Sequence, residues 1–145
     1  MSTRFDLAVE IQASSERVWA VLMDVERWPE WTASVSSVQR VDRVPLTVGS
    51  RTKIVQPKLW PAEWVVTELD ENTGNFTWVN RGPGIQVTAG HRLEPHGNWT
   101  RCTHSLDFSG LLSPLIVWLY GALSRQYLAT EANGLRARAE SIASS

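Results

Sequence analysis

Three side chains that can ligate a metal or transfer protons lie close together in the second half of the chain: His91, Cys102 and His104. Imidazole nitrogen and thiolate sulfur are preferred zinc ligands, and imidazole is the side chain used most often as a general acid or base. A structural zinc site takes four ligands, however, and these three residues lack the short CxxC or HxxxH pairs that hold a site in advance. We therefore expect no bound metal, and we expect Cys102 to be a small buried side chain.

The chain around both histidines alternates between apolar and polar residues on either side of a Pro-His-Gly-Asn segment (95–98). This alternation predicts an antiparallel hairpin. With a four-residue turn at 95–98, His91 faces Cys102 and Ala89 faces His104. The two histidines then share one apolar face as diagonal neighbours, roughly 7 Å apart. Because the opposite face is polar, both imidazoles are predicted to point toward the interior.

Further inward-facing side chains come from the neighbouring predicted strands. A two-residue turn at 83–84 directs Phe76 and Trp78 toward the same face as the histidines. Gln56 lies two residues after Ile54 and is predicted to face inward with it. The pattern therefore predicts an aromatic wall that carries one further polar group, the amide of Gln56.

An enzyme built on these residues would use His91 or His104 as a general acid or base. Gln56 or Tyr127 would then donate a hydrogen bond to a carbonyl oxygen of the substrate. No carboxylate falls on the inward face of the hairpin to orient an imidazole. Each histidine is equally well explained as a ring that is hydrogen-bonded inside the core. If His91 instead contacts a ligand, we expect its ring to set ligand affinity more than folding stability.

The elements that position these side chains form one α+β domain with seven antiparallel strands. They follow in this order: a strand at 5–11, a short helix capped by Ser14 or Ser15, a second short helix containing Pro29, six strands from Val35 onward, and a long helix from Ser113-Pro114 to about Ile142. The long helix would extend roughly 40 Å. The first of the six strands is the least regular, because its valines at 35, 38, 41 and 44 recur every three residues.

Two apolar stripes run along the predicted long helix. The first would close a cavity against the sheet, and it contains Ile116, Leu119, Leu123 and Tyr127. The second is too apolar for a face in water, and it contains Val117, Gly121, Leu128, Ala132 and Leu135. This second stripe either packs within the same fold or forms a dimer contact. The chain is therefore expected to be a monomer or a homodimer.

Composition limits the classes of partner. The 145 residues suit a single domain (1–145), and a net charge of −1 leaves no field to hold nucleic acid. The apolar run at 111–123 is too short to span a bilayer, so we expect no membrane insertion. One cysteine and a polar N-terminus suggest a cytoplasmic protein without a disulfide. Nothing in the sequence calls for a cofactor.

Four local segments resemble those of a known superfamily. They are Ala-Ser-Ser-Glu-Arg-Val-Trp (13–19), Asp-Val-Glu-Arg-Trp-Pro-Glu-Trp (24–31), Val-Gly-Ser-Arg (48–51) and Phe-Thr-Trp (76–78). Together with the order of elements, they resemble the START-like, or SRPBCC, superfamily in its polyketide cyclase/dehydrase branch. The resemblance implies a helix-grip fold, in which a curved sheet wraps a long C-terminal helix around a deep cavity. Relatives use this cavity for lipids, sterols, polyketides and plant hormones.

The resemblance implies that the chain binds a small hydrophobic ligand that is lipid-, polyketide- or quinone-like. The expected contact residues are Gln56, Phe76, Trp78, His91, His104, Phe108, Leu119, Leu123 and Tyr127. One alternative is a polyketide cyclase/dehydrase-type enzyme with a cavity histidine as general acid or base. Another is a non-catalytic interaction module or cofactor chaperone, since relatives include quinone-binding accessory proteins. The segments of the resemblance contain no catalytic group, so they leave these alternatives open.

Overall fold

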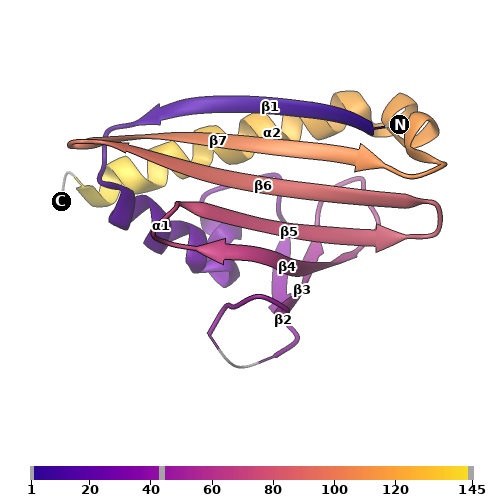
Figure 1. The fold of residues 1–145 in the computed structure, drawn as a ribbon, viewed down its shortest axis with the longest axis horizontal. Coiled ribbons are helices and arrows are strands. Elements are labelled where there is room, and N and C mark those ends of the chain that lie inside the picture. Colours follow the sequence, from indigo (N-terminus) through magenta and orange to yellow (C-terminus); the bar gives the residue numbers. More distant parts are fainter. Residues whose placement is uncertain (1, 43–44, 144–145) are drawn as a thin grey trace.

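The computed structural model describes residues 2–42 and 45–143, in which one antiparallel sheet packs against a long helix (Figure 1). The strand order is β1-β7-β6-β5-β4-β3-β2. The strands are β1 (Ser2–Ile11), β2 (Ser37–Arg40), β3 (Arg51–Val55), β4 (Ala62–Asp70), β5 (Asn75–Gly82), β6 (Ile85–His96) and β7 (Trp99–Ser109). The helices are α1 (Ser15–Met23), the 3-10 helix η1 (Val25–Glu30) and α2 (Ser113–Ala143). This arrangement confirms the predicted helix-grip fold and its order of elements.

The first short helix begins where the sequence predicts, and the second contains Pro29 as predicted. The Ser14 side chain caps α1 by accepting a hydrogen bond from the backbone N–H of Arg17. Pro29 lies inside η1, whose tighter winding suits a short connecting segment. Within η1, Trp28 is buried, and its indole N–H donates to the carbonyl of Leu22 at 3.1 Å. The bond satisfies the single donor of this large ring, so Trp28 can sit in the core.

The β6–β7 hairpin differs from its predicted register by two residues. Gly97 takes a positive φ of 69°, and His96 pairs directly with Trp99, so the turn has two residues and not four. His91 consequently lies opposite His104, with ring centroids 5.2 Å apart, and the predicted diagonal relationship was wrong. Because the displacement is even, every side chain keeps its predicted face. The correction therefore brings the two histidines closer without turning them outward.

Strand β4, whose apolar residues give conflicting patterns, contains a bulge. Val66 pairs with Trp78 and Leu69 with Phe76, and the register shifts between Val66 and Glu68. The extra residue reverses the alternation, so Val66 and Leu69 both face the core. A strict alternation of inward and outward side chains along β4 cannot place both Val66 and Leu69 on the core face. The irregular valine series does not belong to one strand, since β2 is only four residues long and contains Val38 but not Val35 or Val41. Val44 lies outside the described residues.

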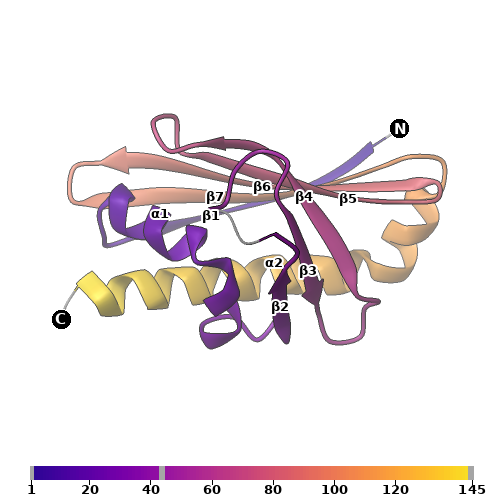
Figure 2. The same cartoon turned by 90° about the horizontal axis from the view of Figure 1, so that it is seen from below.

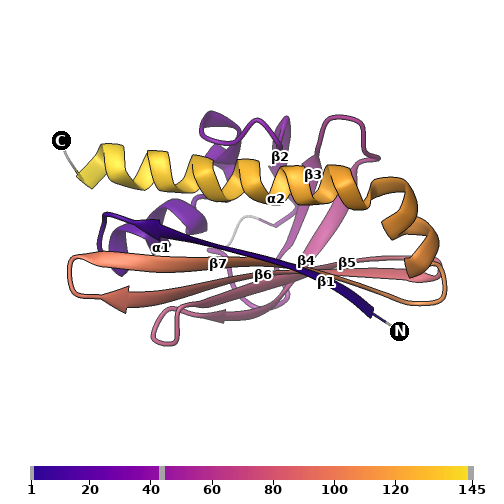
Figure 3. The same ribbon diagram turned by 90° about the horizontal axis from the view of Figure 1, so that it is seen from above.

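Helix α2 runs along one face of the sheet and extends past α1 (Figures 2 and 3). Its second apolar stripe packs largely within the chain, because Gly121, Leu128, Ala132 and Leu135 are buried and Val117 is half-buried. Small residues allow this close packing. The ring of Phe5 lies beside Gly121, and a Cβ at Gly134 would overlap the carbonyl oxygen of Trp31. None of the helices in the described ranges has an apolar stretch long enough to cross a bilayer.

Candidate functional site

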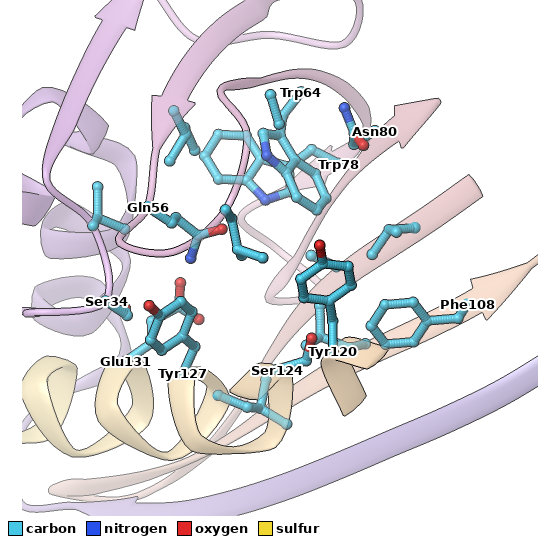
Figure 4. A pocket seen from close by; sticks show the side chains of 18 of the residues that line it. Ser34, Gln56, Trp64, Trp78, Asn80, Phe108, Tyr120, Ser124, Tyr127 and Glu131 are labelled. Atoms are coloured by element: carbon cyan, nitrogen blue, oxygen red, sulfur yellow. The ribbon is translucent and has the colours of Figure 1, made fainter. Parts of the chain in front are cut away.

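A cavity of about 270 Å³ lies between the sheet and α2 (Figure 4). This volume is just below the range of about 300–1,000 Å³ that is common for small-molecule sites. Its apolar and aromatic wall includes Trp28, Val35, Ile54, Trp60, Trp64, Trp78, Ile85, Val87, Ala89, Phe108, Ile116, Tyr120 and Leu128. The indole of Trp60 lines the cavity although it is 84% exposed, so it marks the mouth.

The polar side chains of the wall gather mainly at one end. Figure 4 shows Ser34, Gln56, Tyr127 and Glu131 on one side of the cavity, opposite Phe108 and Asn80. The Tyr127 hydroxyl donates to the carbonyl of Pro57, which fixes α2 against the segment after β3. The cavity therefore has an aromatic wall and, at one end, a group of polar side chains that includes Glu131.

Glu131 is the centre of a hydrogen-bond network behind the polar end. One carboxylate oxygen, Oε2, lies 2.8 Å from His104 Nδ1 and 3.3 Å from His91 Nε2. The far nitrogens of the rings are also engaged. His91 Nδ1 lies 3.2 Å from the carbonyl oxygen of Phe76, and His104 Nε2 lies 3.4 Å from Cys102 Sγ. A single side chain of α2 thus joins both histidines of the hairpin.

The electrostatics of the network favour a carboxylate at Glu131. Burial raises the pKa of Glu131, but the neighbouring His91 and the hydrogen bond from His104 outweigh burial and hold the pKa well below its usual value. Burial lowers the pKa of His104 and, although Glu131 opposes this shift, the ring stays neutral at pH 7. Burial also raises the pKa of Cys102, which remains a thiol.

These charge states determine where the protons lie. His104 donates from Nδ1 to Glu131, so its Nε2 accepts from the thiol of Cys102. His91 stands between two acceptors, the Phe76 carbonyl and the Glu131 carboxylate, and it donates to both only when the ring carries two protons. The hydrogen bond to the Glu131 carboxylate, which can only accept, places a proton on His91 Nε2. The expectation that His91 acts mainly through a ligand loses its basis, because the protein supplies partners for both ring nitrogens.

The second carboxylate oxygen of Glu131 is in a different situation. No donor among residues 2–42 and 45–143 bonds to Oε1, whereas Oε2 accepts two hydrogen bonds. The Glu131 side chain is 16% exposed and lines the cavity. Glu131 therefore offers an acceptor toward the cavity while its other oxygen is held by the protein.

The same cluster also contains three potential metal ligands. The ligand atoms of His91, His104 and Glu131 lie within 4.8 Å of one another. Two ligands at about 2.0–2.1 Å from a tetrahedral zinc stand roughly 3.3 Å apart, whereas His104 Nδ1 and Glu131 Oε2 are separated by 2.8 Å, as in a hydrogen bond. A metal would also have to replace the protons that both rings donate to Oε2. The arrangement fits a proton network better than a preformed zinc site.

Five of the predicted contact residues lie on the cavity wall: Gln56, Trp78, His91, Phe108 and Tyr127. Two others are buried behind the wall, so their predicted exposure to the cavity was wrong. Phe76 is fully buried and stacks on the far side of the His91 ring, with centroids 5.0 Å apart. His104 is also fully buried, because Glu131 and Cys102 occupy both of its polar edges.

The predicted cavity stripe of α2 was wrong at Leu119 and Leu123. The residues that line the cavity are Ile116, Tyr120, Ser124, Tyr127, Leu128 and Glu131. Starting from Ile116, the true stripe advances by four residues, whereas the prediction advanced by three to Leu119. One residue rotates the stripe by about 100°, and Leu119 is accordingly 53% exposed.

Glu131 was not among the predicted cavity residues, because the predicted cavity stripe of the helix was purely apolar and so excluded a charged residue. Glu131 lies four residues after Tyr127, and this spacing places both on the same face of a helix. A charged residue at that distance from a predicted cavity residue was the available signal. The hairpin alone could not show it, since the carboxylate comes from another element.

A family model described as "Polyketide cyclase / dehydrase and lipid transport" matches residues 2–140 of the chain. No curated protein matches the sequence. Solved structures of low sequence identity share the fold.

The Zhui aromatase/cyclase from Streptomyces sp. R1128 has 15% identity and a TM-score of 0.79, with 97% of this chain and 94% of that chain covered. A START superfamily protein from Mycobacterium smegmatis has 19% identity and a TM-score of 0.73, with 96% and 98% covered. Norcoclaurine synthase from Thalictrum flavum, in complex with dopamine and hydroxybenzaldehyde, has 13% identity and a TM-score of 0.74, with 94% and 85% covered.

Proposed function

Because the chain belongs to the polyketide cyclase/dehydrase and lipid transport family, we propose that it is a single domain that binds a small hydrophobic ligand between the sheet and α2. The observation that carries this proposal is the cavity itself, whose aromatic body ends at the ionised Glu131. Sites of this kind gain affinity from apolar contact and orientation from a few polar groups.

The aromatic side chains favour a ligand that contains rings. Trp78 has its ring centroid 5.3 Å from that of Trp28 and 6.0 Å from that of Trp64, so three indoles form a continuous wall. Indoles offer broad, flat surfaces that stack on other ring systems. Since the cavity holds only about 270 Å³, a compact ring system fits this proposal better than a long acyl chain.

The proposal is tested by closing the cavity. Ser124 is buried on the cavity wall, whereas Leu119 is exposed on the same helix. Hydrophobic ring compounds that raise the melting temperature of the natural protein are expected to give no such shift with Ser124→Phe. The matched control, Leu119→Phe, should keep the shift. A shift that survives Ser124→Phe unchanged would place binding outside the cavity.

A second candidate function, acid–base catalysis of the cyclase/dehydrase type, is favoured by the hydrogen bond between the imidazole of His91 and the carboxylate of Glu131 on the cavity wall. In a cyclisation, Glu131 would take a proton from the carbon between two carbonyl groups of a polyketone. The resulting enolate would then form a carbon–carbon bond to another carbonyl of the same molecule. The proton taken up by Glu131 would then return to the new alkoxide, so protons and charge balance.

The enzyme candidate is tested with a soluble poly-β-ketone. Production of a cyclised compound by the natural protein, abolished in Glu131→Gln, would support catalysis. If a polyketone binds but is recovered chemically unchanged, the remaining function is to bind and carry the ligand. Glu94→Gln serves as the control, because Glu94 is partly exposed on β6 away from the cavity wall.

A further inference from the structure

We infer that the ligand presents a protonated amine to Glu131 Oε1. This inference rests on the proposed ligand-binding function and adds the chemical class of the ligand. The two carboxylate oxygens of Glu131 differ in the hydrogen bonds that they accept. Oε2 accepts hydrogen bonds from both His91 and His104, whereas Oε1 has no donor among the described residues.

An acceptor without a donor is costly when a ligand displaces water from around it. A carboxylate oxygen that loses its hydrogen bonds to water must regain them from the ligand, or binding is weakened. Glu131 lines the cavity and keeps 16% of its side chain exposed. Its Oε1, which has no donor among the described residues, is not fully buried, so a bound molecule can reach it. A ligand that fills the polar end therefore needs a hydrogen-bond donor at this position.

The charges of the wall select a cation over an anion. None of the described side chains that line the cavity is a lysine or an arginine, and Glu131 is the one carboxylate among them. A ligand carboxylate or phosphate at this end would face the like charge of Glu131 without a lysine or arginine to pair with it. A protonated amine would instead form a charge-assisted hydrogen bond with Oε1. Fatty acids and other carboxylic acids are thereby disfavoured.

The aromatic side chains near Glu131 also favour a protonated amine. The Trp28 ring lies 5.7 Å from the His91 ring, which is bonded to Glu131, and 5.3 Å from the Trp78 ring. The faces of indole rings attract organic cations, most strongly where water is excluded. A compact aromatic amine can thus place its ring against the indoles and its ammonium group on Glu131.

The inference is tested with four compounds that share an indole: tryptamine (a cation), tryptophol (a neutral alcohol), 3-methylindole (apolar) and indole-3-acetate (an anion). Calorimetric titration at pH 7 should show tryptamine binding at least about tenfold more tightly than 3-methylindole, because charge-assisted hydrogen bonds are the stronger class. Tryptophol should be intermediate, and indole-3-acetate should be the weakest.

Two variants separate the possible outcomes. Glu131→Gln should remove the preference for tryptamine while 3-methylindole still binds, which also shows that the variant is folded. Glu94→Gln should leave the preference unchanged. Equal affinity of the natural protein for all four compounds would overturn the amine inference and leave the proposed function standing. A failure of all four to bind would overturn the inference, and a failure of every hydrophobic ring compound to bind would overturn the proposed function as well.

Discussion

The carboxylate of Glu131 on α2 accepts a 2.8 Å hydrogen bond from the fully buried ring of His104 on β7. This bond joins the long helix to β7, the strand next to the edge strand β1. It also holds Glu131 so that one oxygen faces the protein and the other faces the cavity. The stability of the fold and the chemistry of the site therefore depend on the same side chain.

Removing this carboxylate should destabilise the protein. Glu131→Ala leaves the N–H groups of His91 and His104 without an acceptor in a buried position. We expect the free energy of unfolding to fall by about 2–4 kcal/mol, measured by urea denaturation at pH 7. Glu94→Ala, at a partly exposed position, should change it by less than about 0.5 kcal/mol. A similar small change for Glu131→Ala would show that the network contributes nothing to folding.

Stability should decrease as the pH is lowered from 7.5. Burial lowers the pKa of His104 from 6.5 in the folded state, so the unfolded chain takes up a proton near pH 6.5 that the folded chain does not. The pKa of Glu131 is also lowered, from 4.5, and its contribution is lost as the pH falls below that value. Each group can contribute a slope of up to about 1.4 kcal/mol per pH unit.

The contribution of His104 to this pH dependence can be measured separately. His104→Asn keeps a side-chain N–H donor but cannot titrate, so the loss of stability between pH 7.5 and 5.5 should become smaller. The exposed His96 provides the control, and His96→Asn should leave the slope unchanged. An identical slope in His104→Asn would mean that another group causes the pH dependence.

The thiol of Cys102 should be unreactive in the folded protein. It is fully buried beside His104, and burial raises its pKa, so the nucleophilic thiolate is scarce at pH 8. A chromogenic disulfide reagent should label Cys102 slowly under native conditions and rapidly in urea. Rapid labelling without denaturant would show that the interior behind the cavity opens easily.

The cluster of His91, His104 and Glu131 should hold no stoichiometric zinc, because its shortest ligand separation, 2.8 Å, is that of a hydrogen bond. The protein is incubated with zinc, dialysed, and measured by elemental analysis, with the Glu131→Ala variant in parallel. Zinc near one equivalent in the natural protein, absent from the variant, would show that the cluster is a metal site.

The sequence predicted the fold because its evidence is local. Alternation along the strands and the Ser113-Pro114 start of α2 are both visible in short windows of the chain. The hairpin register was harder, since a Gly97-Asn98 turn and a four-residue turn give the same faces. The bulge in β4 was hidden because its effect appears only through pairing with β5.

The site was less predictable because its central contacts are far apart in the chain. Glu131 lies 40 residues after His91 and 27 residues after His104, and no local pattern joins them. The polar Ser124 and Glu131 also interrupt the apolar stripe that faces the cavity. Apolar spacing therefore selected Leu119, which belongs to an adjacent face of the helix.

Native mass spectrometry of protein purified from its own host shows directly whether the cavity holds a small hydrophobic ligand. We expect a noncovalent adduct of one small molecule on the natural protein. The adduct should persist in Leu119→Phe and disappear in Ser124→Phe, which fills the cavity. An adduct that Ser124→Phe retains, or a bare chain that also fails to bind any hydrophobic ring compound added afterward, would contradict this expectation.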